Sequence, residues 1–521
     1  MKLSLKSSLV EHLMSSGGDD RITLDEVTGL NNYGCEPKPK NLISFSSSTA
    51  STISSGAYNF CKIKQHQLIE RSIESSEYDS YTISVQEIKS FIKSYYSLDE
   101  NVSIVLGPSG TDLEYIALAL SLSKAKKITN IILGLEEVGS GMEYAAAGKY
   151  FSNKSALGKK VIQGQLLHGL DPEIITCKYL PIRNDDGHAL TSNEILSNIE
   201  EVTIQSLKEG RRPLVHAIYR SKTGLITPGI DEIESLSKNY GDKIDIIVDA
   251  CQGRISHLVI NKYLQMGAMV MVTGSKFYCG APFSGAILLP NNSIQNFRKV
   301  DLTSFSGLAP LFTREEIPQY WTSLYQSLNE EVNFGLVLRW YSAIYEMERL
   351  SNVDTEKIQF IIHSFRSLLV KQIHHSNDLL TLYHEDDENP NTSNKISHPL
   401  DENTIATVLI NEIDRKGIEF NYEKAREVQK LLLANIKKLD KETKLLITTA
   451  QTVFHVGQPV KIRRTDDGNN WKANLRVSLG ASKISELSLL ENRSIELKIE
   501  LELKMLFEKL EFILRYLRDE I

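Results

Sequence analysis

The chain has 521 residues, of which 41% are hydrophobic and 24% are charged. This length exceeds what one hydrophobic core usually serves, so we expect a large domain and at least one smaller domain. The formal net charge of −7, from 59 basic and 66 acidic side chains, argues against a protein that binds nucleic acid through general phosphate contacts.

The cysteines and the first residues of the sequence favour a cytoplasmic protein. The five cysteines form no CxxC pair and no His/Cys cluster at zinc-ligand spacing, so we predict no metal site and a reduced, cytoplasmic environment. Glu11 and His12 come before any sustained apolar run, which argues against a secretory signal. No apolar stretch approaches the length that spans a bilayer, so we expect no membrane partner.

The first 95 residues are rich in serine and weakly patterned. "FSSSTASTISSGAYNF" (45–60) is the densest stretch of serine. Composition of this kind favours a surface arm and loops.

From about residue 100, short apolar runs alternate with amphipathic segments. Strands are predicted at 101–106, 128–134, 213–219, 243–250 and 268–275, and helices at 112–125 and 230–241. Such alternation predicts an α/β fold with a mostly parallel sheet that is covered on both faces. After about residue 330 the pattern becomes helical, and strand-like segments at 404–410 and 474–481 suggest a smaller α+β domain.

Ligands of open parallel sheets bind at the carboxyl ends of the strands, so polar residues there are candidate site residues. "LGPSGTDLEY" (106–115) follows a strand and opens a helix, so Ser109, Gly110 and Thr111 would face an anion at a helix N-terminus. The segment lacks the GK[ST] ending of a P-loop, and a single phosphate is the better guest. A plain N-cap without a ligand is the alternative.

A carboxylate and a lysine end two further strands. Asp249 lies at the end of the predicted strand in "IIVDACQGR" (246–254), where a cation such as a protonated ring nitrogen would compensate its charge. Gln252 could reach the same group. Lys276 follows "MVMVTGS" with Ser275 beside it, and a lysine in such a pocket can form Schiff bases with carbonyls. The alternatives are a helix-capping aspartate and a lysine that extends to solvent.

An arginine in the last domain completes the set of candidates. Arg476 lies in the alternating segment "NLRVSLGA" (474–481), where its guanidinium could bind a substrate carboxylate through two parallel hydrogen bonds. A surface strand arginine is the alternative.

Together these segments resemble the fold-type-I pyridoxal-phosphate-dependent enzymes, and most closely the class V aminotransferase and cysteine desulfurase group. "VDACQ" (248–252) is similar to the Asp-Ala-x-Gln of that group, and "TGSK" (273–276) with the following "GAPFSGAILLP" is similar to its cofactor-lysine segment. The resemblance is good over about residues 100–290 and weaker near "GQPV" (457–460) and "NLRVSLGA".

The resemblance implies a fold-type-I transferase fold, with a mostly parallel large domain and a smaller α+β domain. We expect an N-terminal arm that contributes to the small domain at 1–95. A large pyridoxal-phosphate-binding α/β domain would follow at 96–330, and the C-terminal α+β small domain with a long terminal helix at 331–521. A homodimer is also implied, because members of this group complete the site at the subunit interface.

The resemblance also assigns roles around pyridoxal 5'-phosphate. Lys276 would hold the cofactor and then act as the base at the substrate Cα, while Asp249 would keep the ring nitrogen protonated. Gln252 would contact the phenolic oxygen. The remaining roles are a phosphate site formed by Ser109, Gly110, Thr111 and Ser275, cofactor contacts from Ser221 and Thr223 in "YRSKTGLITP", and substrate-carboxylate binding by Arg476.

The sequence departs from the group in the segment that would cover the ring face. No aromatic residue or histidine occurs in "LEEVGSG" (135–141), where relatives often cover the ring face, so Val138 or a glutamate would cover it instead. In the N-terminal arm, Asn32 or Tyr33 would line the substrate pocket, and "FHVGQPV" would bring His455 or Gln458 near the site.

The implied function is that of an enzyme acting on an amino acid through Schiff-base and quinonoid chemistry. A class V-like aminotransferase is the leading hypothesis, because the desulfurases use a cysteine in a loop well after the lysine and only Cys279 follows Lys276. A pyridoxal-phosphate-dependent β-lyase, or a desulfurase-like or tailoring enzyme without a loop cysteine, is the alternative. A non-catalytic binding or regulatory protein on the same fold is the second alternative.

Overall fold

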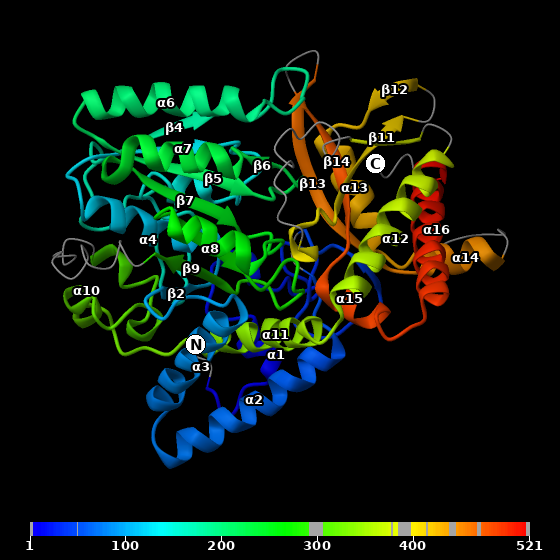
Figure 1. The fold of residues 1–521 in the computed structure, drawn as a ribbon. Helices are drawn as coiled ribbons and strands as arrows, with labels where there is room; N and C mark the ends of the chain where they lie inside the picture. The colour runs from blue at the N-terminus through cyan, green and yellow to red at the C-terminus, as the bar shows by residue number, and fades with distance from the viewer. Residues whose placement is uncertain are drawn as a thin grey trace.

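The computed structural model describes residues 4–48, 51–290, 306–376, 379–383, 398–412, 415–436, 444–465 and 470–516. Two sheets lie side by side, with helices around both (Figure 1).

The larger sheet contains strands from residues 103–289. Its strands are β2 (Ser103–Gly107), β3 (Ile128–Leu133), β4 (Ile175–Leu180), β5 (Arg212–Tyr219), β6 (Ile226–Thr227), β7 (Asp245–Ala250), β8 (Met269–Thr273) and β9 (Gly285–Leu289). They are arranged in the order β2-β9-β8-β7-β5-β3-β4, with β6 paired to β5. The neighbours along β8-β7-β5-β3-β4 are parallel, and β9 runs antiparallel to both β2 and β8. The mostly parallel sheet predicted from the sequence is confirmed.

Helices cover this sheet, and its central strands are therefore buried. All residues of β8 are buried, as expected for a strand covered on both sides. Helix α4 is buried from Thr111 to Ser121 and packs across β2, β9 and β8, whereas α6 packs on β3, β4 and β5. The helices of this part are α4 (Gly110–Leu122), α5 (Met142–Ala145), α6 (Ser192–Lys208), α7 (Ile230–Tyr240), α8 (His257–Gln265) and α10 (Thr322–Ser327).

The smaller sheet joins the two ends of the chain. Strand β1, from the N-terminal segment, pairs in parallel with β13. The strands are β1 (Ile43–Phe45), β10 (Leu380–Leu382), β11 (Ile405–Glu412), β12 (Arg415–Glu419), β13 (Phe454–Arg464) and β14 (Trp471–Ser478). The helices beside this sheet are α12 (Thr355–His374), α13 (Tyr422–Leu433), α14 (Lys444–Gln451), α15 (Ala481–Leu487) and α16 (Asn492–Tyr516). The N-terminal segment therefore contributes a strand to the smaller sheet, while the domain boundaries near residues 95 and 330 stay predictions.

The prediction of an arm and loops over the first 95 residues is wrong for residues 55–95. Helices α2 (Ser55–Glu74) and α3 (Glu77–Tyr95) lie there and pack on α11 (Phe334–Ser351), which also contacts α1 (Val10–Met14). The serines favour these helices: the side chains of Ser54 and Ser76 cap their N-termini, and Ser80 Oγ donates to Leu68 O between them. Serine content alone therefore does not distinguish loops from helices that serine side chains cap.

Short 3-10 helices occur at Asp20–Ile22, Gly241–Lys243, Arg314–Glu316 and Pro399–Asp401. Among the described helices, none combines the length and the apolar character that crossing a bilayer requires.

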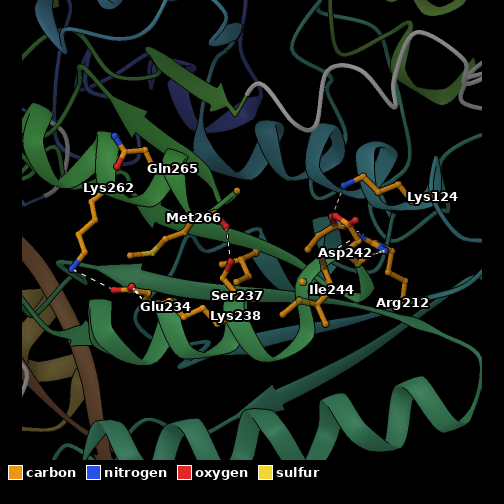
Figure 2. A pocket seen from close by; sticks show the side chains of 14 residues that line it. Lys124, Arg212, Glu234, Ser237, Lys238, Asp242, Ile244, Lys262, Gln265 and Met266 are labelled. Atoms are coloured by element: carbon orange, nitrogen blue, oxygen red, sulfur yellow. Dashed lines mark hydrogen bonds and ion pairs between the residues drawn. The ribbon is translucent and has the colours of Figure 1, made fainter.

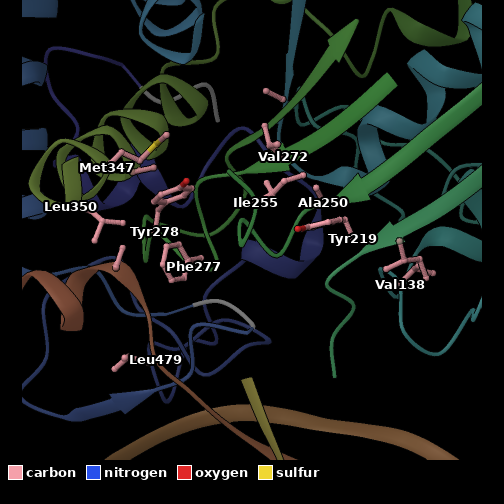
Figure 3. Packing of buried hydrophobic residues seen from close by; sticks show 14 of the residues in the cluster. Val138, Tyr219, Ala250, Ile255, Val272, Phe277, Tyr278, Met347, Leu350 and Leu479 are labelled. Carbon is pink, nitrogen blue, oxygen red and sulfur yellow. The ribbon is translucent and has the colours of Figure 1, made fainter. Parts of the chain in front are cut away.

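The main hydrophobic core is continuous between the two sheets. Figure 3 shows Phe277 and Tyr278, the two residues after Lys276, packed within it together with Met347 and Leu350 of α11. Phe277 is 1% exposed and Tyr278 is fully buried. Their rings pack edge to face, with 5.3 Å between the ring centroids. The backbone that carries Lys276 is therefore anchored by two large buried side chains.

Candidate functional site

A cavity of about 220 Å³ lies at the carboxyl ends of the parallel strands, where both sheets contribute side chains. The predicted site residues that line it are Ser109, Gly110, Thr111, Asp249, Ser275, Lys276 and Arg476. They come from distant parts of the chain, so the fold has brought together most of the candidates chosen from the sequence.

One end of the cavity is the N-terminus of α4. Ser109 is the N-cap: its Oγ accepts from the backbone N–H of Asp112 at 3.3 Å and donates to that residue's Oδ2 at 2.5 Å. The N–H groups of Gly110 and Thr111 lie in the first turn, where a helix offers them no acceptor. A Cβ on Gly110 would lie 2.6 Å from Cys251 Sγ, so only glycine allows this close approach. The arrangement suits an anion such as a phosphate.

A buried carboxyl lies under this anion-binding end. Burial, reinforced by the negative charge of Asp19, raises the pKa of Asp112 to about 7. Its Oδ1 has no hydrogen-bond partner among the described residues. A protonated Asp112 would add no negative charge next to a bound phosphate.

Asp249 and Lys276 occupy the ends of neighbouring parallel strands. Asp249 is the second-last residue of β7, and its Oδ1 accepts from the backbone N–H of Cys251 at 2.9 Å. Lys276 follows β8 and is half-buried, and its Nζ forms no hydrogen bond or ion pair with the described part of the chain. The turn behind it is closed by backbone bonds from Cys279 to Lys276 and from Gly280 to Gly274, each of 3.0 Å. The lysine amine is thus free to react with a ligand.

Arg476 reaches the same cavity from β14 of the smaller sheet. It is 1% exposed, and burial lowers its pKa to about 10. Its Nε donates to Gln458 O at 2.7 Å, and its Nη1 donates to Ser48 O at 3.1 Å and to Lys222 O at 3.3 Å. All these acceptors are neutral carbonyls, so the guanidinium charge remains available to an anion.

Three predicted cofactor residues lie beside the cavity and do not line it in the described structure. Gln252 Nε2 donates to Ser48 O at 3.1 Å. Thr223 Oγ1 donates to Glu137 Oε1 at 2.7 Å, and Ser221 Oγ lies 3.2 Å from Thr223 Oγ1. Direct contact of these three side chains with a cofactor stays a prediction.

Val138 lines the cavity, whereas the neighbouring Glu137 is fully buried in an ion pair with Arg183 at 2.6 Å. Neither Glu136 nor Glu137 lines the cavity, and cover of a ring face by Val138 stays a prediction. Tyr33 and Gln458 also line the cavity, and His455 lies behind it with Nε2 3.2 Å from Tyr33 O.

Among the lining side chains that sequence reasoning missed, three are basic, namely Arg21, Lys222 and His216. Arg21 comes from the N-terminal segment, where no local pattern marks it. His216 lies within β5, and Lys222 lies three residues after that strand ends. The rule that ligands bind at the carboxyl ends of parallel strands, which selected Asp249 and Lys276, could therefore have selected Lys222 too.

A second pocket, of about 550 Å³, lies at the opposite ends of β5 and β7. Figure 2 shows ion pairs among its charged side chains, such as that between Lys262 and Glu234. Asp245 accepts from Lys124 at 2.6 Å and from Arg212 at 2.5 Å. Because these charges are compensated, the larger pocket offers less to a charged ligand than the smaller cavity does.

Comparison with known proteins identifies the fold. No protein-family model matches the sequence, and no curated protein matches it. Among solved structures, a NifS-like protein aligns with a TM-score of 0.50 and 12% identity, over 88% of this chain and 100% of that one. The strand order and this likeness show that the chain has the fold-type-I architecture of pyridoxal-phosphate-dependent enzymes, as the sequence resemblance predicted.

Two further structures align less closely. The ureidoglycine-glyoxylate aminotransferase of Bacillus subtilis has a TM-score of 0.46 and 12% identity, over 81% of this chain and 86% of that one. The glutamate decarboxylase domain of a Vibrio parahaemolyticus protein has a TM-score of 0.48 and 13% identity, over 90% and 81%.

Proposed function

We propose that this protein is a pyridoxal-phosphate-dependent enzyme that acts on an amino acid. The observation that carries the proposal is the convergence of Lys276, Asp249 and the N-terminus of α4 on one cavity, with Arg476 entering from the other sheet. A regulatory protein that had lost catalysis would have no need to keep all these groups together.

The residues present fit the cofactor. The free N–H groups at the start of α4 and the hydroxyls of Ser109, Thr111 and Ser275 would hold the phosphate. Asp249 would hold a proton on the ring nitrogen, and Val138 would cover one face of the ring. When bound, pyridoxal phosphate supplies an electron sink for the carbanion formed at the amino acid Cα.

The chain's own side chains would then orient the substrate and move its proton. Arg476 would bind the α-carboxylate, because its guanidinium meets only neutral carbonyls. Lys276 Nζ, which lines the cavity and forms no ion pair with a described residue, would take the proton from the substrate Cα.

Within this class we propose transamination over cysteine desulfuration. The only cysteine after Lys276 is Cys279, which is buried, and burial raises the pKa of its thiol to about 11. A buried, protonated thiol is a poor acceptor of a substrate's sulfur. A β-lyase needs no such cysteine and remains the second candidate. We further propose a homodimer and a cytoplasmic location, which the family resemblance and the free cysteines support.

The test is the visible absorption spectrum of the protein with pyridoxal phosphate during titration with a panel of amino acids. A cofactor band that shifts while a keto acid appears supports transamination, and release of ammonia or sulfide supports the lyase. Lys276→Ala should lose the band, whereas Lys178→Ala, on the exposed side of β4, should keep it. A protein that stays colourless with added cofactor would contradict the proposal.

A further inference from the structure

Lys222 places a second positive charge beside Arg476 in the cavity. It lies in the loop between β5 and β6 and lines the cavity together with Lys276. Its Nζ donates to Glu136 O at 2.9 Å, which uses one of its three N–H groups. Burial is the largest cause that lowers the pKa of Lys222 to about 8, and the positive charges of Arg476 and Lys276 lower it further.

The loop that carries Lys222 is held firmly on both sides. The backbone N–H of Thr223 donates to Glu137 Oε2 at 3.0 Å, and Arg220 Nη2 donates to Asp401 O at 2.6 Å. Glu137 is in turn fixed by its ion pair with Arg183. Since Arg220 and Thr223 are both held by hydrogen bonds, the fold fixes the backbone position of Lys222 between them.

Neither Lys222 nor Arg476 forms an ion pair with a described residue. Two carboxylates lie near Lys222: Glu137 is paired with Arg183 at 2.6 Å, and Glu136 accepts from Lys222 only through its backbone O. Two neighbouring cations in a desolvated site are costly unless anions meet them. A substrate with one carboxylate would leave one of the two charges uncompensated.

We propose that Lys222 binds a second anionic group of the substrate, so that the enzyme acts on an amino acid with an acidic side chain. Arg476 would take the α-carboxylate and Lys222 the side-chain carboxylate. This inference rests on the proposed function, because it names the substrate class of the same site.

The test compares acidic amino acids with their neutral amides on the holoenzyme. L-aspartate and L-glutamate are titrated against L-asparagine and L-glutamine, and binding is read from the shift of the cofactor absorbance. At least one acidic amino acid should bind about tenfold or more tightly than its amide, as expected for a charge-assisted hydrogen bond. The amides match the acids in shape, so the ratio reports the charge.

Variants of Lys222 locate the preference. Lys222→Gln should reduce the acid-to-amide ratio to near one, Lys222→Arg should keep much of it, and Lys178→Gln should leave it unchanged. Equal binding of acids and amides to the unmodified protein would overturn the inference, and that comparison needs no variant to fold. An equal loss for acids and amides in Lys222→Gln would also overturn it. A coloured holoenzyme without the preference refutes only the substrate class, whereas a protein that takes up no cofactor refutes the proposed function as well.

Discussion

The guanidinium of Arg21 donates a hydrogen bond from Nη2 to Ser109 Oγ at 3.1 Å, although the two residues are 88 positions apart. Arg21 is also paired with Asp19 through Nε at 2.8 Å and Nη2 at 2.7 Å, and its plane lies over the rings of Phe151 and Phe283. The N-terminal segment thereby fixes a cation at the N-cap of α4, next to the proposed phosphate site.

We predict that Arg21→Gln weakens the binding of pyridoxal phosphate by about tenfold, because it removes the cation that balances Asp19 and leaves that carboxylate uncompensated near the anion-binding end of the cavity. Equilibrium binding of the cofactor to the apoprotein measures the effect without depending on activity. The exposed Arg493→Gln is the matched control and should bind the cofactor normally. Unchanged affinity in Arg21→Gln would show that this cation does not act on the phosphate.

Gly110 gives a second prediction, which concerns packing. Its φ is not in the left-handed region and it opens a helix, so alanine would suit its backbone, but a Cβ would lie 2.6 Å from Cys251 Sγ. Gly110→Ala should therefore lower the free energy of unfolding by roughly 2 kcal/mol. In a Cys251→Ala background the same change should cost less than about 1 kcal/mol, because the sulfur is gone.

Urea unfolding of the four proteins in this double-mutant cycle measures the coupling between the two positions. Additive effects would mean that the Cys251 sulfur moves away readily and that Gly110 is not needed for this contact.

His455 gives a prediction on pH. Burial lowers its pKa from 6.5 to about 4. The unfolded chain therefore binds a proton more readily than the folded one between these values, and stability present above the unfolded pKa is lost as pH falls. The full loss for this group is about 3 kcal/mol. Urea unfolding at several pH values between these limits should show a shallower pH dependence for His455→Gln than for the unmodified protein. Parallel pH profiles would contradict a buried, neutral His455.

Much of the large domain could be predicted from local sequence. The strands that end at Asp249 and before Lys276 are continuous apolar runs, and the polar residues after them fall at one edge of the sheet because parallel strands share their direction. The alternating pattern of residues 474–481 predicts a strand that contains Arg476, and β14 carries this residue to the cavity.

Contacts between distant segments could not be predicted in this way. Arg21 reaches Ser109 only because the N-terminal segment folds back, and neither local sequence shows a pattern for that contact. Contact of Gln252 with the phenolic oxygen of the cofactor stays a prediction, and the bond from its amide to Ser48 O, a partner 204 positions away, has no local signal in the sequence. Residue type and strand position do not determine the direction of a buried side chain when several acceptors compete for it.

We propose that Lys276 is the lysine that holds the cofactor. Borohydride reduction of the protein with pyridoxal phosphate, followed by peptide mass spectrometry, tests it most directly because the reduction fixes the cofactor on the amine that carries it. Lys222 lines the same cavity and is a built-in competitor. We predict a phosphopyridoxyl group on Lys276 Nζ and its loss in Lys276→Ala. A label on Lys222 in the unmodified protein, or no label on any lysine, would show that Lys276 does not hold the cofactor.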